Sequence, residues 1–220
     1  MTNVITVDGT ASSGKSTVGF LFAQKIGYQF IDSGLIYRVG TLLAKRNNIS
    51  TADANECARL LSKSNIEFKT TDSKVMVYLN NEDVTDLLKT PEIDKEVPIL
   101  AAHKEVRQAT KSIQRQVGLK QDTVMAGRDI GSEIFPEARL KFFITATTPA
   151  RAKRRFDQSI KNHPDIKYED IEEDIKKRDQ MDAEREASPM RIPDDAIVID
   201  TSNMSIEDVV NKLMAHFQTL

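Results

Sequence analysis

Short apolar runs alternate with amphipathic stretches along most of the chain. The run Val4 to Val7 is typical of a buried strand, and over 15–26 apolar side chains recur at helical spacing until Gly27. The same alternation predicts further strands at 28–31, 123–126, 140–145 and 196–200, and further helices at 35–46, 97–118, 150–161 and 168–186. Strands that alternate with helices predict an α/β fold with a central parallel sheet flanked by helices.

The pattern changes over residues 40–98. Thr51 is placed to cap the first helix of this region. Apolar and polar side chains then alternate over 66–70 and 75–79, on either side of a polar turn, and the pattern allows a third short strand at 82–84. Antiparallel strands within a parallel α/β chain predict an inserted subdomain with a small β-sheet and helices.

Cap residues mark the starts of two later helices. Thr148 with Pro149 forms a cap and first-turn pair before the basic helix 150–161. Ser205, with Asp208 three residues on, predicts a capping box for a C-terminal helix. Both helices therefore begin where polar side chains can satisfy free backbone N–H groups.

The charge balance argues against nucleic acid or a membrane as partner. The 220 residues include 31 Lys and Arg against 33 Asp and Glu, a net charge of −2, so no global field favours a polyanion. No run approaches the ~18 apolar residues of a membrane span, and we expect no signal peptide, because the N-terminus leads directly into a strand. Cys57 has no second cysteine with which to form a disulfide. We expect a cytoplasmic monomer whose partners are small molecules.

The most specific motif lies between the first strand and the first helix. Its spacing is Gly, four residues, Gly, Lys, Ser, in the run Gly9, Thr10, Ala11, Ser12, Ser13, Gly14, Lys15, Ser16 and Thr17. In such a loop, backbone N–H groups surround the phosphates of a nucleotide, Lys15 reaches the β and γ phosphates, and the Ser16 hydroxyl ligates Mg²⁺. The helix that starts at Lys15 adds the positive end of its dipole. The motif therefore predicts a nucleotide phosphate site.

Charged or polar residues follow three of the predicted strands. The first strand ends at Gly9, the second at Asp32 and Ser33, and a later one at Arg128 and Asp129. In open α/β sheets, ligands bind beyond the carboxyl ends of the strands. We therefore expect all three strand ends to face one crevice.

Two helices carry arginines that could reach the same crevice. Arg178, Asp182 and Arg185 are four and three residues apart, so they share one helix face, although a solvated face with an internal ion pair has the same spacing. The second helix carries Arg151, Arg154 and Arg155. These guanidinium groups could stabilise the charge that develops in phosphoryl transfer, as arginine fingers do, while ordinary salt bridges are the alternative.

Taken together, these motifs resemble those of the bacterial cytidylate kinase family, which belongs to the nucleoside monophosphate kinases. The resemblance covers nearly the whole chain. It rests on the blocks Asp8 to Thr17, Asp32 to Arg38, Gly127 to Gly131 with Phe135 and Pro136, Arg178 to Arg185 with Ser188 and Pro189, and Asp195 to Thr201. It implies a P-loop kinase fold like that of adenylate kinase: a core over 1–39 and 99–220, a helical lid at about 151–185, and an insert over 40–98 that binds the monophosphate.

The resemblance also implies a reaction: transfer of the γ-phosphoryl group of ATP to CMP or dCMP, with Mg²⁺. Lys15, Arg128 and Arg178 would act on the transferred group. The lid arginines over ATP would be Arg151, Arg154 and Arg155. Phosphoryl transfer needs alignment and positive charge more than covalent chemistry, and these residue types provide both.

The same resemblance assigns the acceptor site. The residues that would bind CMP are Ser33, Arg38, Arg107, Arg128, Asp129, Arg178, Asp182 and Arg185. The phosphate would be held by Arg38, Arg128 and Arg185, with Arg178 bridging towards the transferred group. The sugar would contact Ser33 and Asp182, and the cytosine edge would contact Arg107 and Asp129.

Two positions depart from the family pattern. Ala126 stands where the family usually has an acidic residue that helps to hold the water shell of Mg²⁺, and Pro98 stands where some relatives place a serine against the base. We hypothesise that Asp8, next to the phosphate loop, takes over as the outer-sphere Mg²⁺ group. The alternative is that the Asp8 carboxylate bonds to nearby backbone.

Two other functions compete with CMP phosphorylation. A kinase of the same superfamily could act on UMP, AMP or shikimate, and only the base-reading residues separate these cases. A non-catalytic ATP-binding regulatory module would use the phosphate loop alone. Against it, the chain has no Asn-Lys-x-Asp guanine-reading motif, and the arginine-rich second site would have no task.

Overall fold

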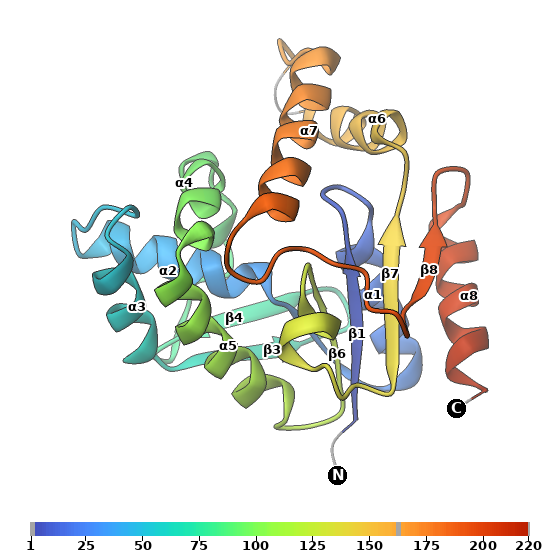
Figure 1. The fold of residues 1–220 in the computed structure, drawn as a ribbon, viewed down its shortest axis with the longest axis horizontal. Coiled ribbons are helices and arrows are strands. Elements are labelled where there is room, and N and C mark those ends of the chain that lie inside the picture. Colours follow the sequence, from blue (N-terminus) through green and yellow to red (C-terminus); the bar gives the residue numbers. More distant parts are fainter. Residues whose placement is uncertain (1–2, 162–163, 220) are drawn as a thin grey trace.

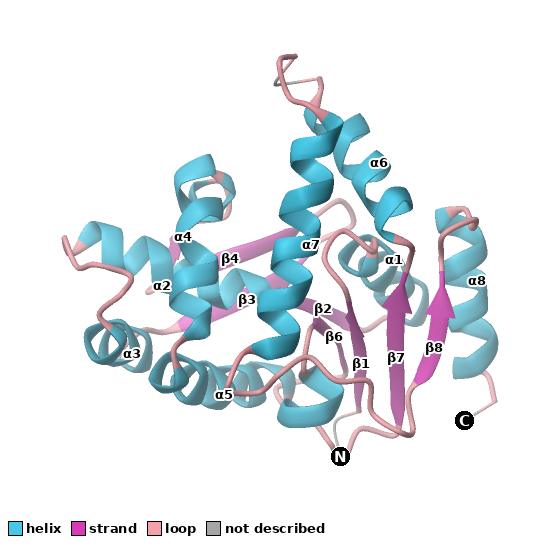
Figure 2. Ribbon diagram, turned by 45° about the horizontal axis from the view of Figure 1, so that its top comes forward, coloured by secondary structure: helices cyan, strands magenta, loops and turns pink. Residues whose placement is uncertain are grey.

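A central five-stranded parallel sheet organises the molecule in the computed structural model, which describes residues 3–161 and 164–219. The strands lie in the order β2-β6-β1-β7-β8 (Figure 2). They are β1 (Val4–Gly9), β2 (Gln29–Asp32), β6 (Thr123–Gly127), β7 (Leu140–Thr145) and β8 (Ile197–Asp200). Their pairings are all parallel, so the carboxyl ends of the strands meet along one edge. The predicted strands and parallel sheet are confirmed.

Each face of the sheet is covered by its own helices, because successive side chains of a strand point to opposite faces. The covering helices are α1 (Lys15–Ile26), α8 (Ile206–Phe217), α2 (Gly34–Arg46) and α5 (Lys104–Gly118). On β6, Val124 and Ala126 pack with α1 and α8, whereas Met125 packs with α2 and α5 on the other face. The capping box at the start of α8, between Ser205 and Asp208, is confirmed.

The region between α2 and α5 contains the predicted small sheet. Its elements are α3 (Ala54–Ser62), β3 (Ile66–Thr70), β4 (Val75–Leu79), β5 (Glu82–Asp83), the short helix η1 (Leu87–Lys89) and α4 (Pro91–Ala102). The strands β3, β4 and β5 are antiparallel, as the alternation predicts. Buried side chains of this region join those of α2 and α5 in one continuous core.

Two helices, α6 (Thr148–Ser159) and α7 (Tyr168–Glu184), lie above the carboxyl ends of the strands (Figure 1). They share a small apolar core of their own. Residues 162–163 of the predicted lid lie outside the described residues. A π-helical turn, η2 (Ile130–Ile134), follows β6 directly.

The start of α3 differs from the sequence prediction. Asp53, not Thr51, caps this helix, and its carboxylate accepts a hydrogen bond from the Glu56 backbone N–H at 3.1 Å. The Thr51 hydroxyl donates instead to the Glu96 carboxylate on α4. Thr51 lies two residues too early to reach the free N–H groups of α3, so it bonds to a neighbouring helix.

Two further helix boundaries are corrected. The predicted helix 97–118 is two helices, α4 and α5, separated at His103, where the backbone is extended. The first of these begins at Pro91, because proline suits the first turn of a helix. At α6, the residue that precedes the helix is Thr147, so Thr148 is its first residue rather than its cap.

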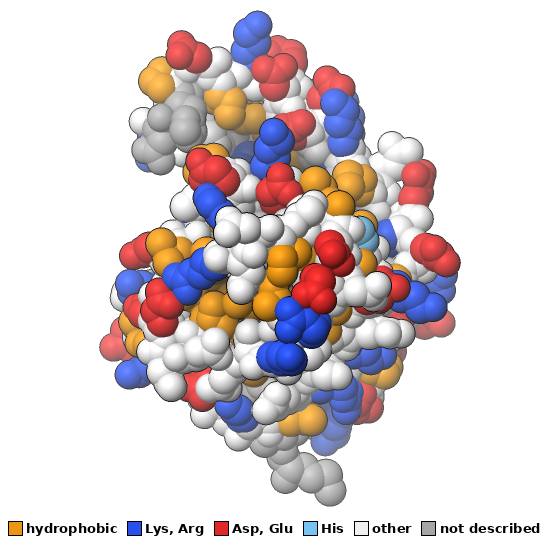
Figure 3. Space-filling model, turned by 90° about the vertical axis from the view of Figure 1, so that its left-hand side faces the viewer, with side chains coloured by type: hydrophobic (Ala, Val, Ile, Leu, Met, Phe, Trp, Pro, Cys, Tyr) orange, Lys and Arg blue, Asp and Glu red, His pale blue; other side chains and the backbone are white. Residues whose placement is uncertain are grey.

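The surface agrees with the balanced composition. On the face near α3 and α4, acidic and basic side chains are interspersed (Figure 3), which argues against a single-sign field for a polyanion on this face. Among the helices in the described ranges, none combines the length and apolar character that crossing a membrane requires.

The hairpin of β3 and β4 also covers β2, the edge strand of the main sheet. Thr70 Oγ1 accepts a hydrogen bond from the Phe30 backbone N–H at 3.0 Å and donates one to the Phe30 carbonyl at 3.3 Å. The Gln29 side chain adds a bond to the Phe68 carbonyl at 2.9 Å. A single hydroxyl thus satisfies both outward-facing backbone groups of a buried residue.

We predict that Thr70→Val destabilises the protein by about 1–3 kcal/mol, because two backbone groups of Phe30 lose their partner while they stay buried. Urea unfolding followed by circular dichroism measures this change. Lys69→Ala, at the exposed neighbouring position, is the matched control and should change stability by less than about 0.5 kcal/mol. Equal stability of the two variants would contradict the prediction.

Candidate active site

A cleft of about 1140 Å³ opens at the carboxyl ends of the parallel strands. Its walls come from the loop after β1, the starts of α1 and α2, helix α4, the turn after β6, and the helices α6 and α7. Ten lysine and arginine side chains and five aspartates line it. This surplus of cations fits ligands that carry several negative charges. The three strand ends expected to share one crevice all contribute to it.

The loop between β1 and α1 allows an anion to approach closely. Gly14 has a φ of +90°, a left-handed conformation that suits glycine. At Gly9 the backbone approaches β7 so closely that a Cβ would lie 2.0 Å from the Ile144 carbonyl oxygen. The hydroxyls of Thr10 and Ser13 are buried without a hydrogen-bond partner among the described residues. Phosphate oxygens would satisfy such donors.

Lys15 lies at the base of this loop, and its ammonium donates a hydrogen bond to the Thr10 carbonyl at 3.1 Å. Burial lowers the pKa of Lys15 well below its ordinary value, and nearby Arg128 lowers it further, while Asp32 acts in the opposite direction. A bound phosphate would add negative charge beside the ammonium and favour its charged form.

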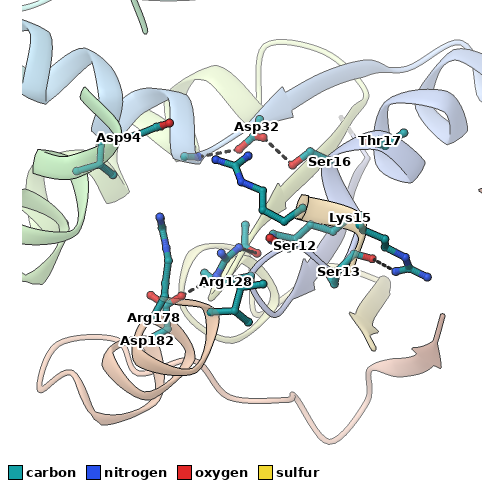
Figure 4. Close-up of a pocket in the computed structure, with 18 of the residues that line it drawn as sticks. Ser12, Ser13, Lys15, Ser16, Thr17, Asp32, Asp94, Arg128, Arg178 and Asp182 are labelled. Carbon is teal, nitrogen blue, oxygen red and sulfur yellow. Dashed lines mark hydrogen bonds and ion pairs between the residues drawn. The ribbon is translucent and has the colours of Figure 1, made fainter. Parts of the chain in front are cut away.

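The residues next to Lys15 fit a magnesium ion that also binds nucleotide phosphates. The Ser16 hydroxyl donates to the Asp32 carboxylate at 2.7 Å (Figure 4). Hydroxyl and carboxylate oxygens suit Mg²⁺, which usually keeps several waters and takes few protein ligands beside substrate phosphates. Within the described ranges, no group of three or more His, Cys, Asp and Glu side chains could hold a metal. A metal held by Ser16 and Asp32 would also take oxygens of the nucleotide phosphates.

The helices α6 and α7 together grip the phosphate loop at Ala11. Asp179 accepts a hydrogen bond from the Ala11 N–H at 3.2 Å, and Arg151 donates one to the Ala11 carbonyl at 3.1 Å. Arg151 and Asp179 are also paired with each other at 2.5 Å. Arg151 is thus buried behind the loop, whereas Arg154 and Arg155 line the cleft.

Charges of opposite sign alternate through the other end of the cleft. Arg128 pairs with Asp182 at 2.8 Å, and Arg185 contacts both Asp182 at 3.3 Å and Asp129 at 3.4 Å. Arg107 pairs with Asp129 from α5. Burial acts to raise the pKa of Asp182, but the guanidinium groups of Arg128 and Arg185 hold that pKa below its ordinary value. The network therefore keeps the Asp182 carboxylate charged.

Two arginines of the predicted acceptor site lie beside this network. Arg38 pairs with Asp94 on α4 and donates to the Leu88 carbonyl at 2.7 Å. Arg178 points into the cleft (Figure 4) and, unlike its neighbours, forms no ion pair within the part of the chain that the structure describes. Burial lowers the pKa of Arg178, and Arg128 lowers it further. Ser33 lines the cleft at the start of α2.

The structure places Asp8 away from the magnesium role hypothesised for it. Asp8 is buried, does not line the cleft, and both of its carboxylate oxygens accept hydrogen bonds from the backbone N–H groups of Ile130 and Gly131. The alternative, bonding to nearby backbone, describes these contacts. Asp32, which lines the cleft beside Ser16, is the better placed carboxylate for a metal.

The sequence analysis assigned no role to several cleft residues. Lys89, Asp94 and Lys95 line the cleft from η1 and α4. No local motif marks them, and only the packing of α4 beside α2 brings them to the cleft. Asp179 was noted as part of a motif but given no task, because its contact with Ala11 spans 168 positions of the chain.

A phosphate loop at the end of the first of five parallel strands, with the helices α6 and α7 above the strand ends, defines the fold of a P-loop kinase. Solved structures share this fold. Shikimate kinase from Bacteroides thetaiotaomicron has a TM-score of 0.51 at 12% identity, over 98% of each chain. An uncharacterized protein from Eubacterium ventriosum has a TM-score of 0.52 at 12% identity, over 99% of each chain. At such identity the likeness concerns the fold alone.

Sequence comparison narrows the class. The family model for cytidylate kinase matches residues 5–219. Cytidylate kinase from Bacillus subtilis (strain 168) is 41% identical over 210 residues, 96% of this chain and 94% of that protein. The enzyme of the same name from Lactobacillus johnsonii is 43% identical over 211 residues, 95% of this chain and 91% of that protein. The chain belongs to the cytidylate kinase family, as the resemblance of its motifs predicts.

We predict that Arg151→Ala lowers the free energy of unfolding by about 3 kcal/mol, because it leaves the Asp179 carboxylate without its partner. The KM for ATP should also rise, since Ala11 loses its carbonyl partner. Urea unfolding and initial rates measure the two effects. Lys153→Ala on the exposed face of the same helix is the control, and a matching loss in both variants would disprove the role of Arg151.

Proposed function

We propose that this protein transfers the γ-phosphoryl group of ATP to CMP or dCMP. The observation that carries the proposal is the cleft itself, which joins a phosphate loop to a cluster of arginines within one cavity. A triphosphate on the loop and a monophosphate on the arginines would lie end to end, as phosphoryl transfer requires. Membership of the cytidylate kinase family supports cytidine nucleotides as the acceptors.

The donor end would bind ATP through the loop, with Lys15 beside the β and γ phosphates. Arg154 and Arg155 would lie over the nucleotide, and Arg151 would support the loop from behind. When bound, Mg²⁺ would neutralise charge between the β and γ phosphates, and Ser16 with Asp32 would hold it. This arrangement supports Mg²⁺ as cofactor and replaces the role that we first gave to Asp8.

The acceptor end would bind the monophosphate. The phosphate would be held by Arg38, Arg128 and Arg185. These arginines now pair with carboxylates, and the phosphate would take over part of those ion pairs. Ser33 and Asp182 would contact the sugar. The cytosine edge would contact Arg107 and Asp129, the pair that the family resemblance implies, and the carboxylate can accept a hydrogen bond from the exocyclic amine.

Arg178 would act on the transferred group. Its guanidinium lines the cleft without a carboxylate partner among the described residues, so it is available for charge that develops on the equatorial oxygens. Closing of α6 and α7 over the nucleotides would exclude water, which otherwise competes as acceptor.

The division of labour along the chain is also our proposal. Residues 40–98 would form the subdomain that binds the monophosphate, residues 1–39 and 99–220 the core, and residues from about 151 to 185 the lid. Support comes from Arg38, Lys89 and Asp94, which bring the insert and its neighbours to the acceptor end. We propose that the enzyme acts as a monomer, because one chain supplies both ends of the cleft. The location that we propose for it is the cytoplasm.

The acceptor can be tested directly with a panel of substrates. With ATP and Mg²⁺, we expect CMP and dCMP to be phosphorylated with a kcat/KM at least about a hundredfold above that for UMP, AMP and shikimate. An acceptor that cannot form the hydrogen bonds of the site leaves its buried polar groups without partners, and this lowers kcat/KM. Coupled measurement of ADP release gives these values. Preference for any other acceptor would refute the assignment, and ATP binding without transfer would favour a regulatory module.

We predict that Arg178→Ala lowers kcat by about 10²–10³, because one donor to the transition-state charge is lost. The KM for CMP should change by less than about threefold, since the other arginines still hold the ground state. Steady-state kinetics separate the two parameters. Arg191→Ala, at an exposed position, is the control. A rise in KM at constant kcat would instead make Arg178 a ground-state ligand.

A further inference from the structure

Asp8 is a buried carboxylate with contacts that the proposed reaction does not use. Only 2% of Asp8 is exposed. Its oxygens accept hydrogen bonds from the backbone N–H groups of Ile130 at 2.9 Å and Gly131 at 2.7 Å. These two amides open η2, the turn that follows Arg128 and Asp129 directly. Asp8 therefore joins β1 to the segment that carries two predicted acceptor ligands.

The carboxylate is carried by a strand end that cannot move easily. Asp8 pairs with Gly127 on one neighbouring strand and with Phe143 on the other. The next residue, Gly9, opens the phosphate loop and lies against β7 so closely that a Cβ there would collide with the Ile144 carbonyl. The donor loop and the Asp8 carboxylate thus share one fixed base.

The turn approaches this base without a gap. A Cβ on Gly131 would lie 2.8 Å from the Thr6 hydroxyl and 3.3 Å from Asp8 Oδ2. Thr6 lies two residues before Asp8, on the same face of β1. Its hydroxyl is buried and has no hydrogen-bond partner in the described part of the chain. Of these two polar side chains, Asp8 alone is bonded to the turn.

We propose that Asp8 is a positioning residue that holds the turn bearing Arg128 and Asp129 in register with the phosphate loop, so that the acceptor site is built against the donor site. This inference rests on the proposed function and adds one residue to it. Asp8 does not line the cleft, so it acts through Arg128 and Asp129. Its loss should affect CMP more than ATP.

The ionisation of Asp8 gives the inference a second readout. Burial raises the pKa of Asp8 to about 7; Asp129 adds to the rise, while the two backbone N–H groups and Lys15 oppose it. From β7, the stem of Lys141 passes near Gly131, but its ammonium is bound to Asp195. Once protonated, Asp8 resembles asparagine, because one oxygen carries a hydrogen that faces a backbone donor.

The test compares Asp8→Asn with Thr6→Val. At pH 8 we expect Asp8→Asn to raise the KM for CMP about tenfold, because a hydrogen bond to a charged group is lost, and to leave the KM for ATP within about twofold. The ratio of variant to wild-type KM should fall to about twofold at pH 6, as wild-type Asp8 takes up a proton. Thr6→Val should match the wild type throughout. A ratio that does not change with pH, or equal effects on both substrates, would overturn the proposal.

A measurement on the wild type alone covers the case in which Asp8→Asn fails to fold. In the nucleotide-free protein, the amide proton shifts of Ile130 and Gly131 should titrate with a midpoint near pH 7. Flat shifts between pH 5.5 and 8.5 would overturn the proposal. This result does not depend on turnover, so a wild type that fails to phosphorylate CMP would refute the proposed function and leave the role of Asp8 to be decided separately.

Discussion

The active site depends on ion pairs that hold several arginine side chains close together in the protein without ligands. Guanidinium groups from α5, from the residue that follows α7 and from the turn after β6 meet in one cleft, and unpaired they would destabilise the fold. Asp129 and Asp182 lie between them and hold Arg107, Arg128 and Arg185 in place. These carboxylates therefore shape the acceptor end as well as neutralise it. They also fix the spacing of the arginines, which a flexible cluster would lose.

The donor end handles its charge differently. Lys15 has a backbone carbonyl as its bonded partner rather than a carboxylate, and the hydroxyls of Thr10 and Ser13 remain unsatisfied. The loop is stiffened from outside, by Asp179 and Arg151 on Ala11. The charge of the arginine-rich end is thus neutralised by carboxylates of the protein, whereas the charge of Lys15 would be neutralised by the bound phosphates. This division suits an enzyme whose donor carries more charge than its acceptor.

The sequence predicted what depends on local spacing. The phosphate loop, the strands, the hairpin and the capping box of Ser205 and Asp208 all involve residues close in the chain, so pattern and cap chemistry suffice. Thr51 shows where such prediction fails. Asp53, two residues later in the chain, caps the helix instead, and the Thr51 hydroxyl bonds to the distant Glu96. The sequence predicted one helix over 97–118 and did not predict the break between α4 and α5, since the helical pattern continues across His103.

Roles in the site were harder to predict where a contact joins distant segments. Asp8 was expected near the metal because it precedes the phosphate loop, yet its partners lie 122 and 123 positions away. Arg151 shares a helix with Arg154 and Arg155, but burial turns it behind the loop. The family resemblance predicted the arginines of the acceptor end, whereas Asp94 lies in no recognisable sequence motif and was not predicted.

The two hydrogen bonds between the Thr70 hydroxyl and the Phe30 backbone on β2 have a consequence beyond stability. An open edge strand offers free backbone groups on which another chain can add a strand, and aggregation follows. Thr70 occupies those groups at Phe30, so the hairpin of β3 and β4 protects this edge of the sheet against neighbouring molecules. The opposite edge, β8, is only four residues long. Trimming the insert to obtain a minimal kinase would therefore uncover the β2 edge and endanger solubility, in addition to removing residues of the acceptor site.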